Sequence, residues 1–154
     1  MTTLNRSQCH GLDLDRHLII DAGAGTGKTT VMSIRYIQHL LCEDQRASRL
    51  LPKGPREPQS GQGALRIPKR QQQDVQEWNG LLPAETVAVT FTVKAAAELK
   101  EKIRSILSDL ASTPDGDSSK KVDPRLRKEG FVEQLTSMLE SAPIGTIDSF
   151  LSRL

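Results

Sequence analysis

The feature that most constrains the fold is the glycine-rich segment AGAGTGKT, residues 22–29, because of what flanks it. The preceding run HLIID, residues 17–21, is short and continuously apolar, which is typical of a strand buried on both faces of a parallel sheet. From Lys28 to about Cys42, apolar side chains recur every three or four residues and predict a helix with one buried face. Together they predict a β-loop-α unit of an α/β fold. The apolar helix positions are Val31, Ile34, Ile37, Leu40 and Leu41.

The glycine-rich loop, residues 22–29, fits the pattern A/G-x4-G-K-S/T, a relaxed Walker A motif with Ala22 at the usual first glycine. Its three glycines let the backbone curl so that N–H groups point at nucleotide phosphates, and the helix start adds its positive dipole end. We expect Lys28 to contact the β- and γ-phosphates and the Thr29 hydroxyl to be a ligand of Mg²⁺, and both to be catalytic. A chance glycine-rich turn is the alternative, but the flanking strand and helix favour a phosphate site. The predicted nucleotide-binding residues of this region are Ala22, Gly23, Ala24, Gly25, Thr26, Gly27, Lys28, Thr29 and Thr30.

A second strand and helix are predicted after residue 80. Residues 86–92 (TVAVTFT) are rich in β-branched residues and predict a strand, and Thr92 is placed to cap the helix that follows. That helix, over residues 94–110, combines good helix formers with an apolar stripe, and Glu98 stands four residues before Lys102. The stripe consists of Leu99, Ile103, Ile106, Leu107 and Leu110.

A third helical stretch is predicted from about residue 126 to residue 140. Gly130 weakens this helix, and Pro143 ends it. Residues 144–147 then predict a further strand, so that strands and helices alternate along the chain. The apolar positions of the helix are Leu126, Phe131, Leu135, Met138 and Leu139.

The composition fits one α/β domain. With 36% hydrophobic residues and only 3% aromatic ones, aliphatic side chains must build the interior. No apolar run approaches the ~18 residues of a membrane span, and the sequence MTTLNRSQCHGLDLDR contains nothing that a secretory signal could use. Cys9 and Cys42 have no neighbours at metal-ligand spacing. We therefore expect reduced thiols, no disulfide or zinc, and a cytoplasmic protein.

The basic excess of the chain is confined to residues 45–80, which carry seven Lys or Arg against three Asp or Glu. This segment also holds four Pro, four Gly and seven Gln without an apolar period, so we expect a flexible insertion. A basic arm of this kind could lie against nucleic-acid phosphates, and a solvated surface loop is the simpler alternative. The expected organisation is a single domain over residues 1–154 that contains this insertion.

Four short segments follow one another along the chain: LNRSQ (4–8), AGAGTGKT (22–29), TFTVKAAAEL (90–99) and IGTIDSF (144–150). In sequence and in order they resemble the amino-terminal part of the UvrD/RecB/AddA-like superfamily 1 DNA helicases. The resemblance implies a RecA-like P-loop NTPase domain with a parallel sheet, incomplete in this chain, that binds ATP and Mg²⁺. It also implies that the full-length protein is an ATP-dependent DNA helicase, which moves along single-stranded DNA and unwinds duplex in DNA repair or recombination.

The resemblance implies roles for residues outside the glycine-rich loop. Gln8 stands at the position of the family's Q motif, and a primary amide presents a donor and an acceptor that match an adenine edge. Phe91, Thr92 and Lys94 belong to the segment that contacts single-stranded DNA in the family, where an aromatic ring can stack on a base. From the residues alone, a strand aromatic such as Phe91 is more often part of the core.

The segment at residues 144–150 departs from the commoner family pattern. Many relatives have His where this chain has Asp148, and a carboxylate beside a DNA phosphate is repulsive, so we expect no direct phosphate contact from Asp148. The hydroxyls of Thr146 and Ser149 are the predicted DNA contacts of this segment. Alternatively, they cap the element that follows.

No carboxylate pair for hydrolysis is recognisable in the sequence. This class of enzyme needs one carboxylate to hold Mg²⁺, another to orient water, and arginines that stabilise the transferring phosphate. We therefore expect the first part of a helicase motor domain, either a fragment or a truncated product, which binds nucleotide but does not hydrolyse it alone. Its expected partners are single-stranded DNA, the remaining helicase domains beyond Leu154 and a helicase–nuclease partner subunit. The alternatives are a small P-loop kinase and a non-catalytic remnant that binds nucleotide or DNA.

Overall fold

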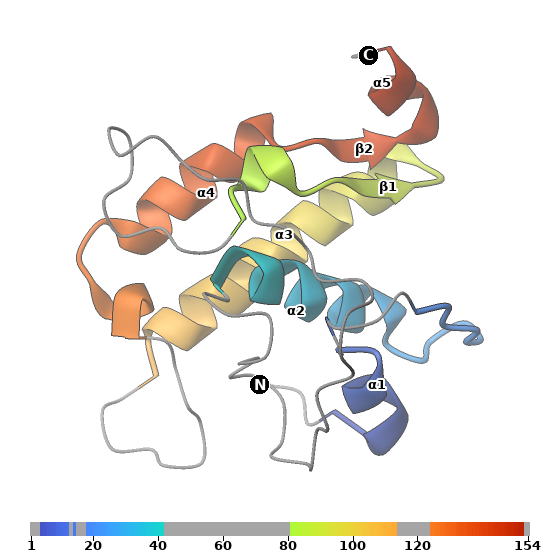
Figure 1. Ribbon diagram of the computed structural model, residues 1–154, viewed down its shortest axis with the longest axis horizontal. Coiled ribbons are helices and arrows are strands. Elements are labelled where there is room, and N and C mark those ends of the chain that lie inside the picture. The colour runs from blue at the N-terminus through green and yellow to red at the C-terminus, as the bar shows by residue number, and fades with distance from the viewer. Residues whose placement is uncertain (1–3, 13, 15–17, 42–80, 114–123, 153–154) are drawn as a thin grey trace, which may run out of the picture.

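The computed structural model of the protein describes residues 4–12, 14, 18–41, 81–113 and 124–152. Five α-helices, two short 3-10 helices (η) and two strands make up this part of the chain (Figure 1). In chain order they are α1 (Arg6–His10), α2 (Lys28–Leu41), η1 (Pro83–Glu85), β1 (Ala88–Thr90), α3 (Val93–Ala111), η2 (Pro124–Arg127), α4 (Phe131–Ser141), β2 (Ile144–Thr146) and α5 (Ile147–Leu151).

The two strands form a parallel sheet, as the alternation of strands and helices predicted. Ala88 lies opposite Ile144, and Thr90 lies opposite Thr146. Because the pairing is parallel and in register, the carboxyl ends of β1 and β2 lie side by side. The described part of the chain is therefore an α/β structure.

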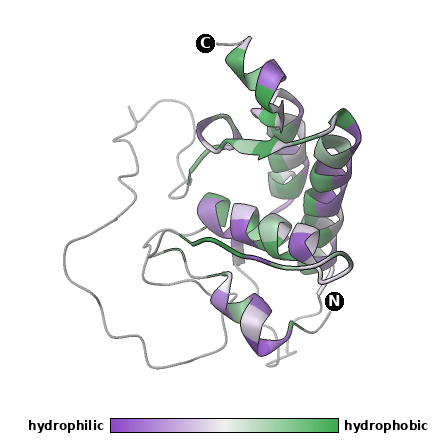
Figure 2. Cartoon of the chain, turned by 90° about the vertical axis from the view of Figure 1, so that its right-hand side faces the viewer, coloured by the Kyte–Doolittle hydropathy of each residue, from purple (hydrophilic) through white to green (hydrophobic). Residues whose placement is uncertain are grey.

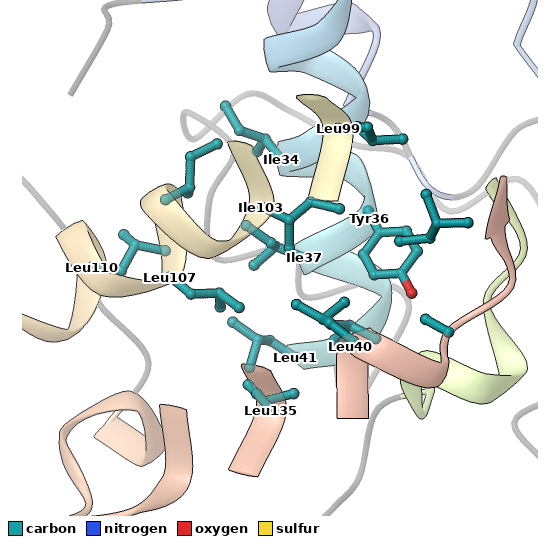
Figure 3. Packing of buried hydrophobic residues seen from close by; sticks show 14 of the residues in the cluster. Ile34, Tyr36, Ile37, Leu40, Leu41, Leu99, Ile103, Leu107, Leu110 and Leu135 are labelled. Atoms are coloured by element: carbon teal, nitrogen blue, oxygen red, sulfur yellow. The ribbon is translucent and has the colours of Figure 1, made fainter. Parts of the chain in front are cut away.

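The core lies between α2 and α3, which pack against each other, and α4 completes it (Figure 3). The apolar stripes predicted for the first two helices are buried, with Ile37, Leu40, Ile103 and Leu107 at 0% exposure. Tyr36 adds the ring of an aromatic residue, and its hydroxyl donates a hydrogen bond to the Pro83 carbonyl at 3.3 Å. The periodicity of the apolar residues therefore predicted the buried faces of α2 and α3 correctly.

The start of α3 is also as predicted. Thr92 is its N-cap, and the Thr92 hydroxyl accepts a hydrogen bond from the Ala95 amide at 3.0 Å. Ala96, one turn after the cap, is buried. The ion pair of Glu98 differs from the one that the sequence suggested. Its carboxylate lies 3.9 Å from the ammonium of Lys94, one turn earlier, whereas the sequence suggested Lys102, one turn later.

The third helix begins later than predicted. Gly130 has a positive φ of 78°, which a right-handed helix does not accommodate, so α4 starts at Phe131. The preceding residues form η2, and Leu126 of that turn still reaches the core at 2% exposure. The predicted single helix from about residue 126 is therefore two elements that are separated at a glycine.

The strand predicted at residues 17–21 is wrong for the residues described. Residues 18–21 pair with no strand of the described sheet, and the Ile19 side chain is 100% exposed. Leu18 and Ile20 are 38% and 50% exposed, and Figure 2 shows the hydrophobic residues of this unpaired stretch in green. A strand is held by hydrogen bonds to a neighbouring strand, which no local apolar pattern supplies. The second predicted strand, residues 86–92, is shorter than expected and is limited to β1.

Other predictions fall on residues outside the described ranges. The flexible insertion expected at residues 45–80 is one of them, and the reduced thiol expected of Cys42 is another. Among the helices that the structure does describe, none combines the length and apolar character needed to cross a bilayer.

The arrangement of the elements gathers several helix starts at one side of the molecule. α3 follows the carboxyl end of β1, and α5 follows the carboxyl end of β2. In Figure 1, α2 also begins on this side, at the right of the view, where the glycine-rich loop leads into it. The segments singled out by the sequence therefore face one end of the described structure.

Candidate functional site

The glycine-rich loop turns at two of its three glycines. Gly25 has a φ of 74° and Gly27 a φ of 80°, values that residues with a Cβ rarely adopt. Gly23 does not have a positive φ, and a Cβ built on it would meet only the Thr26 methyl at 4.0 Å. The prediction that all three glycines allow the backbone to curl is therefore correct only for the second and third.

The side chain of Lys28 folds back over this loop. Its ammonium donates hydrogen bonds to the carbonyl oxygens of Ala22, at 2.6 Å, and of Gly23. An ammonium has three N–H donors, so two are used and one remains. The side chain is exposed, which leaves it free to exchange these carbonyls for a more strongly charged acceptor.

The backbone at the start of α2 offers further donors. The Val31 amide donates to the Gly27 carbonyl at 3.0 Å and is the first amide of the helical ladder. The amides of Lys28, Thr29 and Thr30 precede that ladder, where helices have no intrahelical acceptor for them. The Thr29 hydroxyl is exposed beside them. The loop thus joins free amides, a cation and a hydroxyl, the groups that a phosphate with a divalent cation requires.

Gln8 reaches the glycine-rich loop from the amino-terminal helix. Its side-chain Nε2 donates a hydrogen bond to the Thr26 carbonyl at 2.9 Å. Its Oε1 accepts a hydrogen bond from the Asn5 backbone amide at 2.8 Å, and the Asn5 side chain accepts one from the Gln8 amide at 2.8 Å. The structure therefore brings Gln8, to which the resemblance assigned adenine selection, into contact with the glycine-rich loop.

The helix α1 is fixed beside α2 by the residues that follow it. The Arg35 guanidinium of α2 donates to the Gly11 carbonyl at 3.0 Å, and Leu12 is fully buried in the core. A Cβ at Gly11 would lie 2.9 Å from side-chain methyl groups of both Ile20 and Val31, which would have to shift to make room. The hydrogen bond from Arg35 and the burial of Leu12 therefore hold α1 beside α2.

Asn5 is the site residue that sequence reasoning missed. Asn5 and Gln8 form a reciprocal capping box at the start of α1, in which each side chain bonds the other residue's backbone amide. The spacing of Asn and Gln by three residues is a known signal for this motif. The segment LNRSQ contains that signal, although the resemblance points to Gln8 alone.

Phe91 lies in the turn between β1 and α3 and is 95% exposed. It does not pack into the core of the described residues, the alternative that its strand position favoured. Thr92 and Lys94 follow it in the chain, and both are exposed. The Thr92 hydroxyl serves as the helix cap, while the Lys94 ammonium lies 3.9 Å from the Glu98 carboxylate in an exposed ion pair.

The hydroxyls of Thr146 and Ser149 bond within the start of α5. Thr146 Oγ1 accepts from the Ser149 amide at 3.2 Å, and Ser149 Oγ donates to the Thr146 carbonyl at 2.8 Å. This is the capping arrangement that was the alternative to DNA contact. Asp148 is exposed in the first turn of the same helix, where the helix dipole favours a carboxylate.

Two ionisable groups of α2 have shifted pKa values. Burial lowers the pKa of His39 to about 4, and the charge of Arg35 adds to the effect. Burial raises the pKa of Tyr36 above its usual range. Both side chains are therefore neutral near neutral pH and belong to the packing of the helix.

Comparison with known proteins adds independent information. The profile of the UvrD/REP helicase N-terminal domain matches residues 73–154, which include β1, β2 and α3. An ATP-dependent helicase/nuclease subunit of Streptococcus sanguinis (strain SK36) is 27% identical over 139 residues, 90% of this chain. The chain spans only 8% of the length of that relative. No solved structure matches the chain.

The match to the profile extends over more than half of the chain and includes two of the four segments that carry the resemblance. The other two, at residues 4–8 and 22–29, lie outside it. The chain belongs to the UvrD/REP helicase N-terminal domain family.

Proposed function

We propose that this chain is the ATP-binding portion of an ATP-dependent DNA helicase with a RecA-like P-loop fold. The observation that carries the proposal is the glycine-rich loop, whose Gly25 and Gly27 have positive φ and which presents Lys28 at the start of α2. In the full-length protein, ATP hydrolysis would drive movement along single-stranded DNA and duplex unwinding in repair or recombination, in the cytoplasm. Family membership supports the helicase assignment.

The nucleotide part of the mechanism uses groups already at the loop. Lys28 exchanges the carbonyls of Ala22 and Gly23 for phosphate oxygens, because charged acceptors form the stronger hydrogen bonds. The amides of Lys28, Thr29 and Thr30 bind further phosphate oxygens. The Thr29 hydroxyl would hold Mg²⁺, which when bound would neutralise phosphate charge. Gln8 selects adenine through the donor and acceptor of its amide.

The DNA part of the mechanism centres on Phe91. An exposed ring can stack on any base, at about 1–3 kcal/mol per base, which suits a motor that must tolerate every sequence. Lys94 can leave its exposed pair with Glu98 for a DNA phosphate, because such surface pairs contribute only about 0–1 kcal/mol. Thr92, Thr146 and Ser149 are the further DNA-binding residues that we propose.

Hydrolysis requires groups that we assign to other parts of the helicase. The chain aligns with 8% of its helicase/nuclease relative, and the remaining motor domains would supply the hydrolytic carboxylates and arginines. We therefore propose that the 154-residue chain binds ATP with Mg²⁺ but does not turn it over. A helicase–nuclease partner subunit is part of the same proposal.

The test is ATP binding and ATP turnover by the purified chain, with and without single-stranded DNA, beside a Lys28→Ala variant. We expect binding that depends on Lys28, without turnover. DNA-stimulated turnover that is lost in the variant would support the helicase assignment but overturn the claim that catalysis needs other segments. Equal ATP affinity in the two proteins would overturn the nucleotide site.

A further inference from the structure

The side-chain amide of Gln8 connects two parts of the structure. Its Oε1 faces a donor, the Asn5 backbone amide, and its Nε2 faces an acceptor, the Thr26 carbonyl. Because one partner can only donate and the other can only accept, the orientation of the amide is fixed. Gln8 thus links the cap of α1 to a carbonyl in the glycine-rich loop, 18 residues later in the chain.

We propose that Asn5 is a positioning residue for phosphate binding, which acts through Gln8 on the glycine-rich loop. The inference rests on the proposed ATP site and goes beyond it, because it assigns Asn5 a role at the phosphates, although neither Asn5 nor α1 belongs to the loop. The Asn5 side chain caps α1, the cap fixes Gln8, and Gln8 fixes the Thr26 carbonyl.

Thr26 is the place where such a link has the largest effect. It lies between Gly25 and Gly27, the two residues with positive φ, so the loop is most adjustable on either side of it. A Cβ on Gly27 would lie 2.7 Å from Gln8 Nε2, so the amide also fills the space beside the loop. Holding the Thr26 carbonyl therefore limits the conformations of the loop and prepares its amides for phosphate.

The helix α1, which carries Asn5 at its cap, is anchored to the rest of the described structure. Leu12, just after α1, is fully buried, and the Arg35 guanidinium of α2 donates to the Gly11 carbonyl at 3.0 Å. α1 and the glycine-rich loop are therefore both anchored to α2, and Gln8 closes the connection between them. A loose cap at Asn5 would release one side of this connection.

The Gln8 amide keeps binding capacity for a base as well. A primary amide has two N–H donors and two acceptor lone pairs, and the contacts to Asn5 and Thr26 use one of each. One donor and one acceptor remain, the pair that an adenine edge requires. Adenine recognition and loop positioning are therefore compatible. A ligand that has phosphates but no base tests the loop positioning alone.

The experiment measures the affinity of the 154-residue chain for MgATP and for inorganic tripolyphosphate with Mg²⁺. Asn5→Ala removes the capping oxygen, and Asn5→Ser restores a neutral capping oxygen. We expect Asn5→Ala to weaken the binding of both ligands by about 3- to 10-fold, the effect of one lost hydrogen bond. Asn5→Ser should recover most of the affinity. Ser7→Ala, on the exposed surface of the same helix, is the matched control.

Gln8→Ala provides a second, independent variant. We expect it to weaken tripolyphosphate as well as ATP, and ATP more strongly, because it removes the link and the base contact together. Circular dichroism spectra that match those of the original chain would show that each variant is folded.

The outcomes separate this inference from the proposed function. If Asn5→Ala binds tripolyphosphate as well as the original chain does, the positioning role of Asn5 is overturned and the ATP site stands, and the same result for Gln8→Ala overturns the link through Gln8. If Asn5→Ser is as weak as Asn5→Ala, the role of the cap is overturned. If the original chain binds neither ligand in a Lys28-dependent way, the ATP site fails and the inference fails with it.

Discussion

The ammonium of Lys28 donates a hydrogen bond at 2.6 Å to the carbonyl of Ala22, six residues earlier, and a second one to the next carbonyl. The side chain therefore closes the glycine-rich loop on itself. Both acceptors are neutral, so a phosphate oxygen competes with them favourably. The same contact that orders the loop also holds the cation next to the place where phosphates would bind.

Lys28→Ala should remove ATP binding. The loss of binding free energy for ATP should be about 1.5–3 kcal/mol or larger, as for hydrogen bonds to charged groups. The reason is that Lys28 is the cation that folds over the loop. Isothermal titration with MgATP measures this loss. The denaturant midpoint should stay close to that of the original chain, since the Lys28 side chain is exposed. An unfolded variant would mean that Lys28 has a structural role.

Phe91→Ala should weaken binding of single-stranded DNA and leave ATP affinity nearly unchanged. The ring is 95% exposed, so its removal leaves no cavity, and the loss should be about 1–3 kcal/mol per stacked base. Fluorescence anisotropy with a labelled oligonucleotide measures it. A large drop in the free energy of unfolding, or equal losses for DNA and ATP, would instead indicate a packing role for Phe91.

Gly27→Ala should strain the glycine-rich loop. The residue has a φ of 80°, which costs a residue with a Cβ about 1–2 kcal/mol, and the new Cβ would lie 2.7 Å from Gln8 Nε2. We expect weaker binding of MgATP and a lower unfolding midpoint. Gly23→Ala is the matched control, because Gly23 has no positive φ and an open surrounding. Equal effects of the two changes on the midpoint would contradict this account.

The free energy of unfolding should decrease as the pH is lowered through the range where His39 titrates. Its pKa is about 4 in the folded chain and 6.5 without the surrounding structure, so between these values the unfolded chain binds more protons. The contribution of neutral His39 to the free energy of unfolding is therefore complete above the pKa that His39 has in the unfolded chain. It is lost as the pH falls toward the pKa that His39 has in the folded chain. We expect a loss of about 1–3 kcal/mol, allowing for the partial exposure of the imidazole.

Urea denaturation near neutral pH and near pH ~5 checks this expectation, with a His39→Gln variant for comparison. The glutamine cannot titrate, so the difference in the free energy of unfolding between the two pH values should shrink in the variant. An identical difference in both proteins would assign the pH dependence to other groups.

The sequence by itself determined the buried faces of α2 and α3, the cap of α3 and two turning glycines of the loop. The apolar stripes of α2 and α3 are buried as their periodicity predicted, and Thr92 caps α3 through its own hydroxyl. Gly25 and Gly27 turn the loop, as a glycine-rich motif requires. These features depend on residues within one or two turns of each other, so short-range patterns contain the information.

Tertiary structure decided the rest. The apolar run at residues 18–20 forms no strand with the described sheet, and the strands that do pair, β1 and β2, are far apart in the chain. The exposure of Phe91 and the bond from Gln8 to the Thr26 carbonyl also depend on which segments meet. Strand pairing, burial and long-range hydrogen bonds are set by the packing of distant segments, and a local pattern does not specify its distant partner.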